Sequence, residues 1–179
     1  MKILVVVDMQ HDFIDFALGT PEAVAIVPNV IDRIKQADKD KEIIIFTRDT
    51  HSDNYLNTPE GKKLPIEHCI EHTLGWCIPQ TIIQATKQPI VINKPTFGSV
   101  MLVDAIVELM EHDNLKQEDL EIEFCGLCTD ICVISNVLLI KANFPNAGIK
   151  VNSQLCAGVT PQKHEAALEV MRSCQIDII

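Results

Sequence analysis

The residue types best suited to covalent chemistry lie in the stretch Phe124–Val133, which reads FCGLCTDICV. The preceding residues, Asp119–Phe124, alternate acidic and apolar side chains and predict a strand, whereas apolar residues that follow recur at helical spacing. Gly126 gives the backbone freedom to turn between strand and helix. Cys132 would then lie in the first turn of the helix, where free N–H groups and the helix dipole lower the pKa of a thiol. A cysteine in this position is suited to act as a nucleophile.

The same stretch allows other interpretations. Thr129 or Asp130 is expected to cap the helix, and Cys132 after it could simply be a small buried apolar residue. Cys125, Cys128 and Cys132 could also suggest a zinc or iron–sulfur cluster. They would face different directions across a strand, turn and helix, and no fourth thiol lies nearby in the chain. A nucleophile therefore needs partners from elsewhere.

Charged residues follow two further predicted strands. The apolar run Ile3–Val7 is typical of a buried parallel strand and is followed by Asp8, and the strand predicted over Pro89–Asn93 is followed by Lys94. Functional groups gather at the carboxyl ends of parallel strands, so Asp8 is placed to act as an acid or base. Lys94 beside it would keep the acid ionised and stabilise a thiolate. The alternatives are a capping aspartate and a solvated lysine.

A third group of residues has the chemistry of metal ligands. Asp49 and His51 lie at the end of a predicted strand, and His68 lies in the long segment 52–79, which has no clear periodicity. One oxygen and two imidazoles suit zinc, iron or manganese with positions open to water or substrate, and Glu60 could add a fourth ligand. The alternative is that these are solvated loop side chains.

Length and composition narrow the function classes. The 179 residues, 47% of them hydrophobic, fit one domain over residues 1–179 with a sizeable core. The net charge of −10 argues against nucleic acid or an anionic membrane as a partner. No apolar run is long enough to cross a bilayer, and the first strand reaches an acid too soon for a signal peptide. Seven cysteines without a secretory signal predict reduced thiols and a cytoplasmic location.

Helices and strands alternate along most of the chain, which predicts a parallel sheet with helices on both faces. Ser99 and Thr160 are expected to cap helices, Trp76 to lie in the core and His164 to be exposed. The remaining expected elements are helices over residues 28–39, 99–112 and 160–172 and strands over residues 42–47, 148–151 and 174–179.

Three motifs together resemble the isochorismatase-like cysteine hydrolases, the family that includes nicotinamidases and N-carbamoylsarcosine amidohydrolase. They are VDMQxDF at residues 7–13, KxxFGS at 94–99 and GxxTDxCV at 126–133. The resemblance covers essentially the whole chain and implies a three-layer α/β/α, Rossmann-like fold with a mostly parallel sheet. It also implies a catalytic triad, a cis peptide bond and an oxyanion hole. The triad would be Asp8, Lys94 and Cys132, the cis bond Leu127–Cys128, and the oxyanion hole the N–H groups of Cys128 and Cys132.

The metal-binding members of this family are similar to the chain at Asp49, His51 and His68. The resemblance thus implies a divalent metal, zinc, manganese or iron, and no organic cofactor. Nicotinamidases often carry a further histidine where this chain has Tyr55, and many have a Trp-Pro pair that this chain lacks. Glu60 would take the missing ligand's place. These departures weaken nicotinamide as the substrate more than they weaken hydrolase chemistry.

The resemblance implies a homo-oligomeric hydrolase that cleaves a C–N amide bond of a small molecule through a thioester, as nicotinamidases do. Phe13, Phe97 and Ile131 are the expected pocket residues. One alternative on the same scaffold is cleavage of a ureido or carbamoyl amide, or of the vinyl ether of isochorismate. The other is a non-catalytic protein that binds a thiol or a metal.

Overall fold

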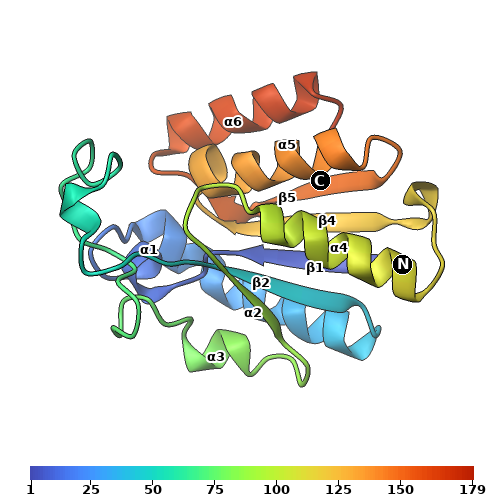
Figure 1. Ribbon diagram of the computed structural model, residues 1–179, viewed down its shortest axis with the longest axis horizontal. Helices are drawn as coiled ribbons and strands as arrows, with labels where there is room; N and C mark the ends of the chain where they lie inside the picture. The colour runs from blue at the N-terminus through green and yellow to red at the C-terminus, as the bar shows by residue number, and fades with distance from the viewer.

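Six parallel strands form the centre of the protein, in the order β3-β2-β1-β4-β5-β6. Figure 1 shows four of them, β2, β1, β4 and β5, between the helices. The computed structural model describes residues 1–179. The sequence predicted a mostly parallel sheet, and every strand pair is in fact parallel. The strands are β1 Lys2–Val7, β2 Ile43–Asp49, β3 Ile90–Lys94, β4 Glu121–Leu127, β5 Gly148–Ala157 and β6 Asp177–Ile178.

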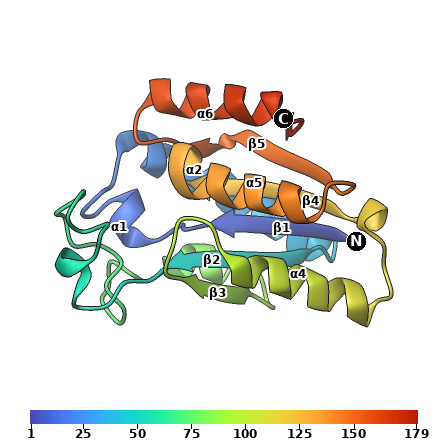
Figure 2. The same cartoon turned by 45° about the horizontal axis from the view of Figure 1, so that its top comes forward.

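Helices cover both faces of this sheet, so the predicted three-layer architecture is confirmed. Helices α4, α5 and α6 cover one face, and α2 and α3 lie on the other (Figure 2). The helices are α1 His11–Ile14, α2 Pro21–Lys39, α3 Gln80–Ile83, α4 Val100–His112, α5 Ile134–Asn143 and α6 Pro161–Ser173. Short 3₁₀ turns occupy Tyr55–Asn57 and Gln117–Asp119, and a π turn occupies Thr129–Val133. None of the helices has both the length and the apolar character needed to span a bilayer.

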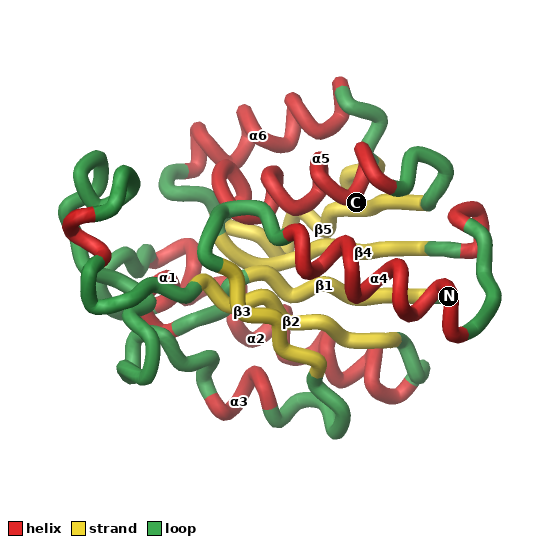
Figure 3. The backbone as a smooth tube through the Cα atoms, viewed as in Figure 1, coloured by secondary structure: helices red, strands yellow, loops and turns green.

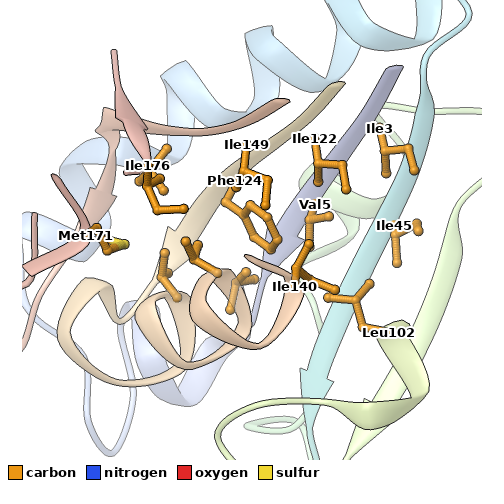
Figure 4. Close-up of a cluster of buried hydrophobic side chains, with 14 of the residues drawn as sticks. Ile3, Val5, Ile45, Leu102, Ile122, Phe124, Ile140, Ile149, Met171 and Ile176 are labelled. Carbon is orange, nitrogen blue, oxygen red and sulfur yellow. The ribbon is translucent and has the colours of Figure 1, made fainter. Parts of the chain in front are cut away.

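The period-two alternation of β1 divides the apolar side chains between two cores. Ile3 and Val5 face the α4–α6 side, whereas Leu4 and Val6 face the α2 side. All four are fully or almost fully buried. Figure 4 shows the first core, in which Phe124 of β4 packs between the sheet and α5. A strand buried on both faces reads as a continuous apolar run, as it does in this sequence.

The start of α2 differs from the prediction. The helix begins at Pro21 rather than Pro28, and the hydroxyl of Thr20 accepts a hydrogen bond from the N–H of Ala23 at 3.0 Å. Pro28 is exposed inside the helix, where it removes one backbone donor. The cap at Thr20 and the buried stripe that begins at Ala23 outweigh this lost hydrogen bond.

The other helix and strand boundaries differ less from those predicted. The caps at Ser99 and Thr160 are confirmed, because their hydroxyls each accept a hydrogen bond from a backbone N–H at 3.2 Å. Strand β5 runs to Ala157, well beyond the predicted end, and its pairing with β4 contains a register shift. Trp76 is buried as predicted, with the guanidinium of Arg48 lying 3.4 Å from its ring centroid. The long segment between β2 and α3 lies at the end of the sheet to which the strands point (Figure 3).

Candidate active site

The chemistry-bearing residues follow neighbouring strands, and the parallel sheet brings them together. Asp8 follows β1, Asp49 and Lys94 end β2 and β3, and Cys132 lies in the turn after β4. Asp49 and Lys94 are directly opposite each other in the sheet register. Since all strands point the same way, these side chains share one edge of the sheet.

Lys94 is fully buried and connects the other three groups. Its Nζ lies 2.7 Å from Asp8 Oδ2, 3.2 Å from Asp49 Oδ1 and 3.4 Å from Cys132 Sγ. The hydroxyl of Thr47 donates to Asp8 Oδ1 at 2.7 Å and fixes the carboxylate from its other side. An ammonium group, a carboxylate and a thiol are therefore in mutual contact in an interior site.

Burial strongly affects the pKa values of Lys94, Asp8 and Cys132. Burial alone would lower the pKa of Lys94, but the charges of Asp8, Cys132 and Asp49 outweigh it and hold that pKa above its ordinary value. Burial raises the pKa of Asp8, although Lys94 opposes the shift. Burial and the Asp8 charge also raise the pKa of the Cys132 thiol. The predicted low thiol pKa is thus wrong for the resting site, because desolvation outweighs the helix terminus and Lys94.

The end of strand β4, just before the turn that carries the thiol, requires glycine. Gly126 has a φ of +113°, and a Cβ added there would overlap the backbone carbonyl of Val7 on β1. One residue further along, the peptide bond between Leu127 and Cys128 is cis. The backbone N–H of Cys128 donates no hydrogen bond, which leaves a donor beside the thiol. The residues that follow, Thr129–Val133, form a π turn before α5 begins.

The predicted helix cap is wrong. Cys128 holds the cap position, and Thr129 and Asp130 lie inside the π turn. Both side chains instead tie the turn to the β5–α6 segment. Thr129 Oγ1 lies 2.8 Å from Nδ1 of His164, and Asp130 Oδ1 accepts from the N–H of Val159 at 2.9 Å. His164 is only 16% exposed, contrary to the prediction that it would be exposed, because it packs over this turn.

Asn136 is a supporting residue that sequence reasoning missed. It is fully buried, and its Nδ2 donates to the carbonyls of Cys132 at 2.8 Å and Phe97 at 3.0 Å. Its Oδ1 accepts from the N–H of Ser99 at 2.9 Å. Asn136 thus joins the thiol turn to the loop after Lys94. A polar residue on the buried face of a predicted helix was the available signal.

Gln10 and Asp12 support the candidate metal ligands in a similar way. Gln10 accepts from the N–H of Asp49 at 2.7 Å and donates to the carbonyls of Asp49 and Trp76, both at 2.9 Å. Asp12 Oδ2 accepts from the N–H of Cys69 at 2.7 Å. Both belong to the first sequence motif, but only their tertiary contacts reveal what they position.

Three predicted metal ligands come together in a buried cluster. The ligand atoms of Asp49, His51 and His68 all lie within 4.8 Å of one another. His51 Nε2 is buried without an aligned hydrogen bond, although Asp49 Oδ2 is 2.9 Å away. His68 Nδ1 lies 2.8 Å from the carbonyl of Ile66, which can only accept, so Nε2 of His68 keeps its lone pair for the cluster. Glu60 Oε1 is 3.7 Å and 3.9 Å from the two Nε2 atoms.

These donors fit a divalent cation. Two imidazole nitrogens and carboxylate oxygens are the ligand types of zinc, manganese and iron sites, and one nitrogen here has no aligned partner. The carboxylate of Asp49 contacts both the buried lysine and the histidine cluster, since Oδ1 contacts Lys94 and Oδ2 faces His51. Burial alone would raise the pKa of Asp49, but His51 and Lys94 lower it overall.

Tyr55 lies against the cluster without joining it. Its ring is fully buried, with its centroid 4.7 Å from that of His51 and 4.9 Å from that of His68. Its hydroxyl donates to the carbonyl of Leu64 at 3.0 Å and so points to another partner. Burial raises the pKa of Tyr55 to about 12, which keeps the phenol neutral. Glu60 is therefore better placed than Tyr55 to join Asp49 and the two histidines as a ligand.

A cavity of about 520 Å³ opens onto the thiol. Phe13, Phe97 and Ile131, the three pocket residues suggested by sequence, all line it, as do Cys128 and Cys132. This volume lies in the range of small-molecule sites, and most of the wall is apolar.

The metal-ligating residues and the triad lie differently with respect to this cavity. Asp49, Glu60 and His68 line one side of it. Asp8 and Lys94 are fully buried and do not line it. A molecule bound in the cavity would thus meet the thiol of Cys132 and the side chains of Asp49, Glu60 and His68 directly.

Comparison with known proteins agrees with this architecture. The sequence matches the family model described as the isochorismatase domain over residues 2–179. It is 24% identical over 206 residues to a nicotinamidase of Schizosaccharomyces pombe, with 98% of this chain and 91% of that protein covered. The pyrazinamidase of Pyrococcus horikoshii in complex with zinc superposes with a TM-score of 0.79 at 24% identity, covering 99% of this chain and 98% of that one. For the N-carbamoylsarcosine amidase of Thermoplasma acidophilum the TM-score is 0.77 at 21% identity, covering 99% and 94%. The chain belongs to the isochorismatase family.

Proposed function

We propose that the protein is a cysteine amidohydrolase that cleaves the C–N bond of a small-molecule amide through a thioester. The observation that carries the proposal is the contact of one buried ammonium group, Lys94 Nζ, with both the Asp8 carboxylate and the Cys132 sulfur. The sulfur also lines a cavity large enough for a small molecule. The family relationship to amidases gives the proposal independent support.

In the proposed reaction, Asp8 accepts the thiol proton, and the sulfur of Cys132 forms a bond to the amide carbonyl carbon. The raised pKa of Asp8 makes it a better proton acceptor than an ordinary carboxylate. Lys94 stays charged and offsets the negative charge that moves from the carboxylate to the sulfur. Burial keeps the resting thiol protonated, so the thiolate forms only as this transfer occurs.

The N–H groups of Cys128 and Cys132 are the proposed donors to the oxyanion. The free N–H of Cys128 beside the thiol supports this role. One such donor typically contributes about 2.7–4 kcal/mol to the transition state. The C–N bond then breaks, and Asp8 returns its proton to the leaving amine.

The second half of the reaction regenerates the thiol. Water gives a proton to Asp8 and attacks the thioester carbon, the C–S bond breaks, and the sulfur takes the proton back. The products are a carboxylic acid and ammonia or another amine.

A divalent metal is the proposed cofactor of the neighbouring cluster. Asp49, His51 and His68 would hold it, with Glu60 as a further ligand. When bound, it would supply a Lewis acid that fixes a polar group of the substrate at the cavity wall. Zinc in the pyrazinamidase of P. horikoshii supports this assignment by analogy.

A carbamoyl or ureido amide is the second candidate substrate class. The fold is similar to that of an N-carbamoylsarcosine amidase, and Tyr55 replaces a histidine that nicotinamidases often carry. Both classes contain a C–N bond next to a carbonyl and need the same thiol.

The test is ammonia release from nicotinamide, pyrazinamide and ureido compounds by the wild type, Cys132→Ala and Cys132→Ser. The matched control is Cys174→Ser, which changes a partly exposed cysteine outside the cavity. We expect release by the wild type and the control, and none by either Cys132 variant. Turnover at the wild-type rate by Cys132→Ala would refute the proposal, provided that its circular dichroism spectrum matches the wild type.

A further inference from the structure

Two lysines line the cavity without a partner. Lys63 comes from the loop that also carries Glu60, and Lys163 comes from the first turn of α6, so they reach the cavity from separate elements. Neither ammonium group forms an ion pair or a hydrogen bond, whereas Lys94 and Lys150 both contact carboxylates. Both ammonium groups are therefore available to an anion bound in the cavity.

The rest of the wall offers little else to a polar group away from the thiol. Apolar side chains dominate, and the hydroxyl of Thr20 is already engaged with a backbone N–H. The acidic residues of the wall, Asp49 and Glu60, face the histidine cluster. Apart from the histidine cluster that would hold a metal, the groups free to receive a polar part of a substrate are the two ammonium groups.

We infer that the substrate is an amide whose acyl group carries a carboxylate at the end remote from the C–N bond. This inference rests on the proposed function and names its substrate class, an ω-carbamoyl carboxylate with an apolar spacer. The amide lies at Cys132, the spacer lies along the apolar wall near Phe13 and Phe97, and the carboxylate lies between Lys63 and Lys163. A lysine is a flexible point charge, so the two side chains would accept spacers of several lengths.

The expected gain in affinity for a carboxylate is modest, because both lysines are exposed. An exposed ion pair typically changes affinity by about 1.4- to 5-fold, so two lysines together give about 2- to 25-fold. Salt screens such pairs, so the preference should shrink as ionic strength rises.

The test uses matched probes that differ only in charge. One is 4-carbamoylbenzoate, and its neutral partner is 4-acetylbenzamide, in which a methyl ketone replaces the carboxylate. Their Kd values are measured by calorimetry on Cys132→Ala, which cannot turn them over, and their kcat/KM values on the wild type. A series with two to five methylene groups as the spacer, each with its methyl-ketone partner, covers aliphatic substrates.

We expect the acid to bind about 2- to 25-fold more tightly than the ketone, and this ratio to fall toward one in Lys63→Met/Lys163→Met. The control is Lys62→Met, since Lys62 is exposed next to Lys63 but does not line the cavity. A ratio near one for every pair, or a ratio that the double variant leaves intact, would overturn the inference. Hydrolysis of neutral amides without acid preference would leave the proposed function standing. Preferential binding of the acids with no hydrolysis of any amide would instead overturn the function.

Discussion

Replacing Lys94 with methionine tests whether this side chain is the electrostatic centre of the site. Methionine keeps most of the volume but removes the charge, which leaves Asp8 and Asp49 as buried carboxylates 2.7 Å and 3.2 Å from the lost nitrogen. Removing one partner of a buried ion pair typically costs about 3–5 kcal/mol. For a domain of this size, each kcal/mol lowers Tm by about 2–4 °C, so Lys94→Met should melt roughly 6–20 °C below the wild type.

The double variant Lys94→Met/Asp8→Asn makes the test specific. It removes the uncompensated Asp8 charge, so its loss of stability should be smaller than the sum of the two single losses, by about 0.5–3 kcal/mol. The assay is urea unfolding of all four proteins followed by Trp76 fluorescence, with chelator present so that metal binding does not contribute. Single-variant losses below about 1 kcal/mol, or strictly additive losses, would refute the electrostatic account. The activity of each variant should fall by at least about 100-fold.

Three further predictions concern the turn, the metal cluster and the dependence of stability on pH. Gly126→Ala should fail to fold or unfold in much lower urea than the wild type, because its φ of +113° and a backbone carbonyl of β1 exclude a Cβ. Native mass spectrometry should detect a bound metal on the wild type and on His72→Ala, which changes an exposed histidine, but not on His51→Ala. Hydrogen bonds from the Thr86 hydroxyl and from a backbone N–H lower the pKa of Asp38 in the folded protein. Asp38 therefore stabilises the fold at pH values above its unfolded pKa, and this stabilisation is lost as the pH falls through the folded pKa. Asp38→Asn should remove this contribution from the pH dependence of the free energy of unfolding, measured in urea. An unchanged pH dependence in Asp38→Asn would contradict the prediction.

The positions of Asp8 and Lys94, two of the proposed catalytic groups, could be read from local patterns. In β1, the continuous apolar run followed by Asp8 identifies the strand end, because a strand covered on both faces has no room for a charge in its middle. Lys94 likewise ends the β-branched run of β3, which is an edge strand whose first two residues are exposed. The caps at Ser99 and Thr160 were also predictable, because a hydroxyl next to a helix start acts on backbone N–H groups only three residues away. Such features depend on neighbours in sequence.

Other features were missed or predicted wrongly because they depend on residues far apart in the chain. In place of the cap expected at Thr129 or Asp130, these side chains contact His164 of α6 and Val159 just before α6. Asn136 and Gln10 read as ordinary polar residues until tertiary structure places backbone groups against them. No local pattern encodes these contacts.

By itself, the sequence determined the alternation of strands and helices, the parallel sheet and the edge at which the functional groups lie, because apolar periodicity and the chemistry of strand ends are local properties. Tertiary structure alone decided the contacts of Lys94 with Asp8, Asp49 and Cys132 and the raised pKa of the thiol. It also decided which lysines line the cavity without a partner. Proton affinity depends on burial and on every nearby charge, and both are set by strands and loops that meet only when the chain has folded.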